Sequence, residues 1–460
     1  MKQIILLFII TTFLSSCSDS KEHKTTQQTN QSVQKTEQNQ LLKGKVSYVN
    51  TNAVSYTYYL PTNYNDSVKY PVFFIFDPHA SGELPVNLYK SYAEKFGYIL
   101  VASNDSKNGT NYQRINNIIN SLLDDALKRF SIDQNRIYTM GFSGGARVAS
   151  LMAFNKYLIN GCVLCGGGLM QNLQANHNVN ILSFVGNTDF NLNEMLELNK
   201  SIPDSFYHHL IIFDGKHQWP DSITIEDAFY WTTFNEIRQN LRPVKENIIN
   251  DFYNKNIKSA QKYYNTDKLK TYYIYSKIYD FLNGLIKLNE IKTELSAISK
   301  NGIYKKQVSE LKNVLKNEQI REQDLMRNFD TKDTIWWKNT ITKLAKDTLN
   351  DNINSQSNKR ILAFLGLISY MQVNTVLKQN QILIADKYDA IYKYVNPENP
   401  EAFYIGALIA AKQNNTDKVL KNLKQAFAKG FDDFNRLNNE QSFVYLLNNQ
   451  QFQDIINGSY

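Results

Sequence analysis

Hydrophobic and polar positions follow two alternating patterns along residues 45–240. The continuous apolar runs Tyr70–Phe76 and Tyr98–Ala102 predict strands that are buried on both faces of a parallel sheet. Segments with helical spacing, Leu84–Phe96 and Ile115–Phe130, alternate with them. Short strands that alternate with helices indicate an α/β domain in which helices cover both faces of a mostly parallel sheet.

The same alternation continues to the end of this region. Ligands of such sheets bind beyond the carboxyl ends of the strands, so we expect the site at that edge. The further predicted elements are one or two edge strands in Val46–Tyr59, the strands Arg136–Met140, Gly161–Leu164, Ile181–Val185 and His209–Phe213, and the helices Ala146–Tyr157 and Ser222–Gln239.

From about Glu246 the pattern becomes purely helical. Strand-like runs disappear, Gly and Pro become scarce, and apolar residues recur at helical spacing, which predicts a helical region over residues 246–395. Its apolar stretch Arg360–Val373 is too short to cross a membrane and is interpreted as a buried helix.

In residues 396–460, large and small packing residues recur at Phe403, Ala407, Val419 and Ala426. With this spacing the segment resembles a tetratricopeptide repeat, followed by a capping helix that we expect over Phe443–Ile456. One such repeat cannot bury its own apolar face, so the resemblance implies that residues 246–460 stack as one helical array. The array is expected either to contact a protein partner or to act as a stabilising appendage. The match departs from the repeat at Val419, where alanine is usual.

The N-terminus predicts a signal peptide over residues 1–16. A short charged start is followed by the apolar stretch Ile4–Leu14, which is too short for a stable membrane span. The sequence Leu14-Ser-Ser-Cys17 resembles a bacterial lipobox, in which the cysteine is lipidated; the alternative is a plain signal peptide. Polar residues then predict a flexible tether over 17–44. The resemblance implies a protein anchored in the bacterial cell envelope, outside the cytoplasm, through Cys17.

Composition narrows the function classes. The chain of 460 residues is 42% apolar, enough for two or three packed domains. Its net charge of +8 comes from interspersed charges, so nucleic-acid binding is not expected. Cys162 and Cys165 should face opposite sides of a strand as core thiols rather than a redox or metal pair. His208 and His209 would likewise diverge, and neither a metal nor a cofactor is predicted.

The strand Arg136–Met140 leads into Gly141-Phe142-Ser143-Gly144-Gly145, a G-x-S-x-G pattern. In a nucleophile elbow, a serine occupies the sharp turn between a strand and a helix, and the glycines leave room for the crossing. The Gly144 N–H would then lie at a helix N-terminus, where it can donate to an oxyanion.

Two further residues complete a candidate triad. Asp189 follows the strand Ile181–Val185, and His217 follows His209–Phe213, so nucleophile, acid and base occur in the order Ser143, Asp189, His217. This is the chain order of α/β-hydrolases. Asp214 also lies close to His217 in sequence and is the rival acid.

On the G-F-S-G-G elbow, the G-x-x-D loop and the G-x-H-x-W-P loop, residues 45–240 resemble α/β-hydrolases such as polyhydroxybutyrate depolymerase-like and feruloyl-type esterases and their peptidase relatives. The resemblance implies a doubly wound α/β-hydrolase sheet. It also implies that Ser143 attacks an acyl carbonyl, His217 carries the proton and Asp189 orients the imidazole.

The second oxyanion donor is expected in the loop at 77–80. Pro78 lacks an N–H, so the main chain of His79 is preferred, with Ala80 as the alternative. The loop departs from the His-Gly pattern common in the family. Candidate substrate contacts, each with a structural role as the alternative, are Phe142, Trp219 and Asn104, with Asp105 beside Asn104.

These observations predict a lipid-anchored serine hydrolase that cleaves small-molecule or glycan-linked carboxylic esters (class EC 3.1.1). Two alternatives remain: a peptidase similar to prolyl oligopeptidase, which the triad order does not exclude, and an inert binding scaffold in which the helical array is the working part.

Overall fold

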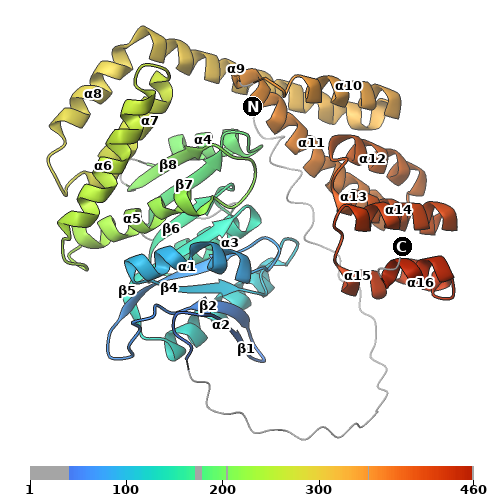
Figure 1. Ribbon diagram of the computed structural model, residues 1–460, viewed down its shortest axis with the longest axis horizontal. Coiled ribbons are helices and arrows are strands. Elements are labelled where there is room, and N and C mark those ends of the chain that lie inside the picture. Colours follow the sequence, from blue (N-terminus) through green and yellow to red (C-terminus); the bar gives the residue numbers. More distant parts are fainter. Residues whose placement is uncertain (1–40, 171–178, 204–205, 351, 458–460) are drawn as a thin grey trace, which may run out of the picture.

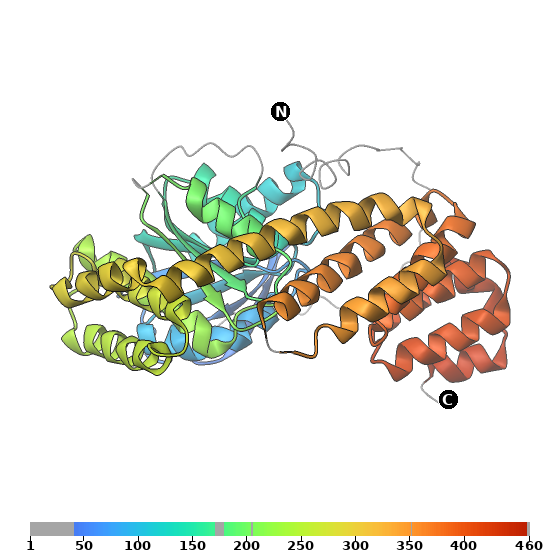
Figure 2. The ribbon, with the colours of Figure 1, turned by 90° about the horizontal axis from the view of Figure 1, so that it is seen from above.

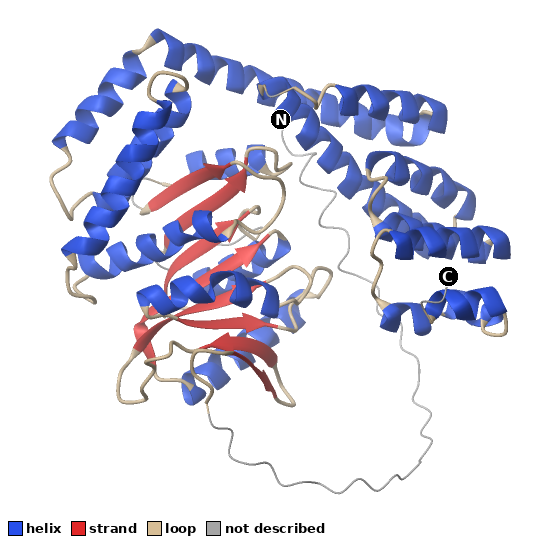
Figure 3. Ribbon diagram, viewed as in Figure 1, coloured by secondary structure: helices blue, strands red, loops and turns tan. Residues whose placement is uncertain are grey.

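The computed structural model describes residues 41–170, 179–203, 206–350 and 352–457. Within them the chain forms one eight-stranded sheet with flanking helices, followed by a region made of helices (Figures 1 and 3). The predicted signal peptide and Cys17 lie outside the described residues, as does the tether up to residue 40.

The sheet has the strand order β1-β2-β4-β3-β5-β6-β7-β8. Strand β2 is antiparallel to both of its neighbours, and the strands from β4 across to β8 are parallel. This order and direction are those of the α/β-hydrolase fold, so the predicted fold class is confirmed. The strands are β1 Val46–Asn50, β2 Ser55–Tyr59, β3 Tyr70–Phe76, β4 Ile99–Ser103, β5 Ile132–Phe142, β6 Ile159–Cys165, β7 Asn180–Gly186 and β8 His208–Phe213.

Helices cover both faces of the sheet. On one face, α1 (Glu83–Phe96) and α5 (Ser222–Arg238) contribute Val86 and Phe229 to the core. On the other lie α2 (Tyr112–Arg129), α3 (Gly144–Asn155) and α4 (Leu192–Ser201). Helix α2 shows the local cause: its apolar side chains recur at the spacing of one helical face, and the Asn111 side chain caps its first turn by accepting from the Arg114 N–H.

Central strands feed both cores because successive side chains of a strand point to opposite faces. Phe73 and Phe74 of β3 are both fully buried and belong to different cores. Cys162 and Cys165 of β6 are likewise free thiols buried in opposite cores, which confirms that interpretation. Burial raises the pKa of Cys162 to about 12, so this thiol stays protonated and unreactive.

The chain after α5 is helical throughout the described residues. Its first helices extend the core of the α1 and α5 face, because Phe252, Phe281 and Ile291 join the same cluster as Phe229. The helices are α6 Glu246–Tyr263, α7 Lys268–Leu282, α8 Asn289–Lys300, α9 Gly302–Thr331, α10 Thr334–Lys346, α11 Ile353–Lys378, α12 Ile382–Val395, α13 Pro400–Lys412, α14 Thr416–Ala428, α15 Phe434–Asn438 and α16 Gln450–Ile456.

Helix α9 connects the sheet to the remaining helices. Its residue Leu315 joins the core on the sheet face covered by α2, α3 and α4, whereas Leu325 and Phe329 belong to a separate core formed with α10 to α16. Figure 2 shows this long helix passing across the α/β part toward α11. The parallel strands point their carboxyl ends toward the side on which α11 to α14 lie (Figure 3).

The structure corrects one prediction at the C-terminal end. A single capping helix over Phe443–Ile456 is wrong: a 3₁₀-helix covers Gln441–Leu446, and α16 begins only at Gln450. The chain turns between them, and the Asn449 side chain caps the new helix by accepting from the Phe452 N–H.

Helix α11 is long and apolar enough to span a membrane by length and composition. It nevertheless buries Ile361, Leu365 and Ile368 in the core shared with α12 and α13. Its Arg360 is also buried, in an ion pair with Glu318 of α9. These contacts fit the predicted buried helix of a packed array.

Candidate active site

Ser143 lies between β5 and α3, with φ 52° and ψ −120°, a backbone conformation that residues other than glycine rarely adopt. Its N–H donates to the Cys165 carbonyl at 2.8 Å, which ties the turn to the neighbouring strand β6. A backbone conformation of this kind costs about 1–3 kcal/mol of folding free energy and persists only where the surrounding structure holds it in place. The serine hydroxyl is thereby fixed at the carboxyl edge of the sheet.

Two glycines permit this sharp turn. A Cβ on Gly141 would lie 2.1 Å from the Gly145 carbonyl oxygen, and one on Gly145 would lie 2.0 Å from the Phe76 carbonyl oxygen. Both approaches are to backbone atoms, which have little freedom to move away. Glycine is therefore required at both positions, as the elbow pattern predicts.

The three predicted triad residues are hydrogen-bonded in series. His217 Nε2 lies 2.9 Å from Ser143 Oγ. On the other side of the ring, His217 Nδ1 lies 2.9 and 3.0 Å from the two carboxylate oxygens of Asp189. A proton on Nδ1 would be held by the carboxylate and leave Nε2 free to accept from the serine hydroxyl.

Asp189 is fully buried and held in a tight turn after β7. Its Oδ1 also accepts from the Asn191 N–H at 2.8 Å, so local chain geometry fixes the carboxylate. The rival acid Asp214 points elsewhere. It is 74% exposed and pairs with Lys270 at 2.9 Å, and it accepts from the Asn187 side chain.

A glycine run after β6 lies beneath the three residues, a role that the sequence motifs did not predict. A Cβ on Gly166 would lie 2.9 Å from both Asp189 Oδ2 and a ring carbon of Phe142. A Cβ on Gly167 would lie 2.5 Å from the Ser143 carbonyl oxygen. The signal in the sequence was the three consecutive glycines after Cys165, which allow this close approach.

Two aromatic rings enclose the His217 imidazole. The ring centroids of Phe142 and Phe190 lie 4.7 and 4.2 Å from that of His217. Phe190 directly follows Asp189, and its role could not be predicted from the sequence because an aromatic residue in a loop has no distinctive pattern. The two rings restrict how the imidazole can turn while it keeps its hydrogen bonds.

The predicted substrate contacts have structural partners. Phe142 and Trp219 are both buried, and Trp219 Nε1 donates to Asp77 Oδ2 at 2.8 Å. Asn104 Oδ1 accepts from the Gly82 N–H and the Thr57 hydroxyl. For all three, the geometry fits the structural alternative, in which they support the loops of the site.

The oxyanion donors are only partly placed. The Gly144 N–H lies at the start of α3 and has no acceptor among the described residues, so it is available to a ligand. The His79 N–H donates to Asp77 Oδ1 at 2.8 Å, and the Ala80 N–H to the Asp77 carbonyl at 3.2 Å. This geometry does not support the role predicted for the His79 main chain, because Asp77 engages its donor.

Asn108 is a further residue near the site that no sequence motif indicated. A Cβ on Gly144 would lie 1.8 Å from Asn108 Oδ1, so this side chain borders the elbow. Its N–H donates to the Pro78 carbonyl at 2.8 Å, which joins its loop to the one after β3.

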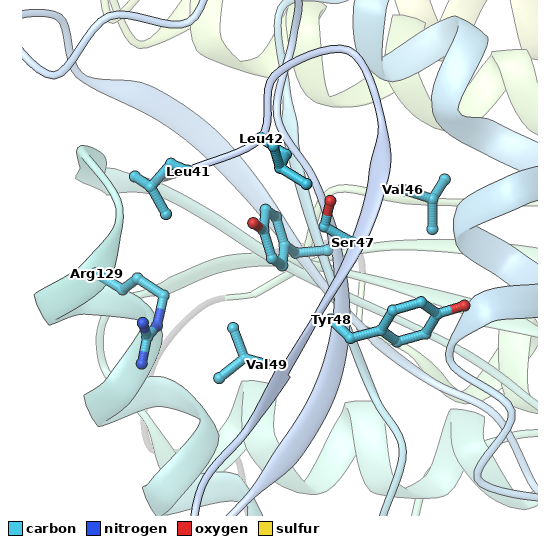
Figure 4. A pocket seen from close by; sticks show the side chains of 8 residues that line it. Leu41, Leu42, Val46, Ser47, Tyr48, Val49 and Arg129 are labelled. Carbon is cyan, nitrogen blue, oxygen red and sulfur yellow. The ribbon is translucent and has the colours of Figure 1, made fainter. Parts of the chain in front are cut away.

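A pocket of about 280 Å³ lies at the side of the sheet formed by the edge strand β1, and it is lined mainly by residues of β1 and by Arg129 (Figure 4). Arg129 is paired there with Asp125, and the pocket contains no nucleophile with a base beside it. Within the residues that the structure describes, no group of three or more His, Cys, Asp or Glu side chains could hold a metal ion.

Comparisons with known proteins give only distant matches, all to solved structures. No family model and no curated protein matches the chain. Among solved structures, Est1E from Butyrivibrio proteoclasticus is 14% identical, with a TM-score of 0.33, over 40% of this chain and 95% of its own. A ferulic acid esterase from Anaeromyces mucronatus is 18% identical, with a TM-score of 0.32, over 43% of this chain and 93% of its own.

The acylaminoacyl peptidase of Pyrococcus horikoshii gives a match of the same strength. It is 14% identical, with a TM-score of 0.34, over 43% of this chain and only 42% of the peptidase. Because these scores are low, the function proposed below depends on the site geometry and the sequence motifs.

Gly166→Ala tests the packing beneath the three residues. The added methyl group would press on Asp189 and Phe142, and Gly166 also has a positive φ of 57°. We expect kcat/KM for an activated ester to fall roughly 100-fold, because small displacements of a reacting group are that costly. The control is Gly284→Ala, which has a φ of +81° and no neighbour within 4 Å of the new Cβ. Equal losses in both variants would mean that backbone strain alone is responsible.

Proposed function

We propose that the protein is a serine hydrolase that cleaves carboxylic esters through an acyl-enzyme. The observation that carries the proposal is the continuous hydrogen-bond series from Ser143 Oγ through His217 to buried Asp189. A nucleophile within reach of a base, which is itself oriented by a third group, is the arrangement needed to activate a weak hydroxyl nucleophile.

In the proposed reaction, Ser143 Oγ attacks the acyl carbonyl carbon while its proton passes to His217 Nε2. Asp189 stabilises the imidazolium, and the Gly144 N–H donates to the oxyanion of the tetrahedral intermediate. Collapse of this intermediate breaks the ester bond, and the alcohol leaves with the proton from Nε2. A water molecule then repeats the sequence on the acyl-enzyme: its proton passes to Nε2 and returns to Ser143 as the acid is released.

The substrate class is proposed as a small-molecule or glycan-linked ester in class EC 3.1.1, on the resemblance of the elbow and its two partner loops to feruloyl-type esterases. The same three residues would also serve a peptidase, so peptide cleavage is the alternative within the enzyme class. An inert scaffold is the alternative outside it. The supporting features for a scaffold are confined to the helical array, whose tetratricopeptide-like helices α13 and α14 are proposed to bind a protein partner.

Reaction with a fluorophosphonate distinguishes an enzyme from a scaffold. We expect the purified protein to be labelled at Ser143 and Ser143→Ala to be inert, because only a serine activated by its base attacks the phosphorus. Ser81→Ala, which changes an exposed serine of the loop after β3, should be labelled normally. A folded wild-type protein that takes up no probe would favour the scaffold. A panel of matched ester and amide substrates then decides between esterase and peptidase.

The two candidate acids can be compared directly. Asp189→Asn should lower kcat/KM for an activated ester by roughly 10⁴-fold, because the amide favours the wrong histidine tautomer. Asp214→Asn removes a carboxylate that is 74% exposed and does not contact His217, so it should be nearly neutral. The assignment fails if Asp214→Asn is the crippled variant.

We also propose that the protein is lipid-anchored through Cys17 on the extracytoplasmic side of a bacterial membrane. The support is the lipobox-like sequence and the polar tether that follows it. Cys17→Ser should move the protein from the membrane to the soluble fraction and abolish labelling with a palmitate analogue. Ser20→Ala, a change nearby in the tether, should leave both unchanged. Full membrane retention of Cys17→Ser would rule out the anchor.

A further inference from the structure

Two polar contacts connect the helical array to the loops that carry Asp189 and His217. Arg360 of α11 donates through Nη1 to the Asn187 carbonyl at 2.6 Å, across 173 positions of sequence. Lys270 of α7 pairs with Asp214 at 2.9 Å. The two contacts differ in environment: Lys270 and Asp214 are 36% and 74% exposed, so solvent screens them, whereas the Arg360 side chain is only 1% exposed.

Arg360 is fixed before it reaches the loop. Its Nε and Nη2 donate to both carboxylate oxygens of Glu318 on α9, at distances between 2.6 and 3.0 Å. Glu318 is also buried, so this pair is shielded from water. A two-point contact between a planar guanidinium and a carboxylate sets direction as well as distance. The remaining nitrogen, Nη1, is thereby directed at the Asn187 carbonyl.

Among the buried groups Arg360, Glu318 and Glu322, one positive charge faces one negative charge. Glu322 lies one helical turn from Glu318 and is also buried. Burial and the neighbouring Glu318 raise the pKa of Glu322 to about 8, so it is mostly neutral at pH 7. Glu318 is then the single carboxylate that balances Arg360, and the guanidinium keeps a donor for the loop.

Asn187 connects the loop after β7, which carries Asp189, to the loop after β8, which carries His217. Its N–H donates to the Phe213 carbonyl at 2.8 Å, and its side chain both donates to Asp214 and accepts from the Gly215 N–H. Asp189 is only two residues further along the same turn. A displacement of Asn187 would therefore change the position of Asp189 relative to His217.

We propose that Arg360 is a positioning residue for the reaction. Through the Asn187 carbonyl, it lets the helical array hold the turn at 186–189 in the geometry that aligns Asp189 with His217. This inference rests on the proposed hydrolase function for its kinetic consequence. Its structural consequence, the alignment of the Asp189–His217 hydrogen bond, does not require that function.

Arg360→Lys is the variant that tests this proposal. Lysine keeps the charge and can pair with Glu318, but its single ammonium group cannot form the two-point contact and also reach Asn187 in the same geometry. We expect kcat for an activated ester to fall roughly 10- to 100-fold with KM little changed, because the alignment of the base is lost rather than substrate binding. The His217 Nδ1–H signal in the proton NMR spectrum, identified by its loss in His217→Gln, should shift or broaden.

Arg242→Lys is the matched control. Arg242 also bridges a fully buried glutamate, Glu236, and a backbone carbonyl, that of Phe96. Phe96 ends α1, three residues before β4 begins at Ile99, so this bridge lies at the amino ends of the strands, whereas the triad lies at their carboxyl ends. The control should lose thermal stability to a similar degree as Arg360→Lys but keep its kcat and its His217 signal.

Glu318→Asp provides a second variant if Arg360→Lys does not fold. It keeps both charges and draws the guanidinium away from Asn187, so it should reproduce the fall in kcat and the altered His217 signal. The proposal is overturned if a folded variant keeps both wild-type values, or if Arg242→Lys changes them equally. If the wild-type enzyme neither labels nor turns over, the proposed function fails, and the His217 signal alone decides whether Arg360 positions the acid.

Discussion

The site depends on the strained backbone at Ser143. A positive φ at a serine is unfavourable, and here the surroundings leave no alternative: the Cys165 carbonyl fixes the amide, and backbone atoms crowd Gly141 and Gly145. Gly167 packs against the serine carbonyl from below. The rigid turn gives the hydroxyl one position, and the loops after β7 and β8 must bring Asp189 and His217 to it.

Local rules were enough to predict the sheet and the elbow. The strand predicted over Tyr70–Phe76 has these bounds in the structure, because a continuous apolar run can be recognised as a strand buried on both faces without knowledge of its neighbours. The elbow could be recognised for a similar reason, because its glycines occur at fixed spacing within five consecutive residues, although Gly145 is crowded by the Phe76 carbonyl of a neighbouring strand. Chain order proposed the three site residues but left Asp189 and Asp214 as rivals, and the hydrogen bond to His217 separates them.

Contacts between distant segments could not be predicted. Neither the glycine run beneath Asp189 nor the Arg360–Asn187 contact follows a periodicity, because each depends on which loops meet after folding. The predicted role of the His79 N–H as an oxyanion donor is not supported for a local reason. This N–H donates to the Asp77 carboxylate in a tight turn instead. The prediction of one capping helix over Phe443–Ile456 did not take into account that Asn449 can cap the start of a new helix.

The helical array is mechanically joined to the α/β part rather than attached by a linker. Phe252 and Phe281 stack at 4.9 Å within the core that contains Phe229, so the first array helices share apolar burial with the sheet. Helix α9 then carries Leu315 in the core of the sheet's other face and Leu325 in the core of the array. Because one continuous helix spans both cores, Glu318, which lies between these two leucines, is held at a defined place relative to the sheet. That placement is what allows a residue of α11 to meet a loop of β7 with the accuracy that a hydrogen bond demands.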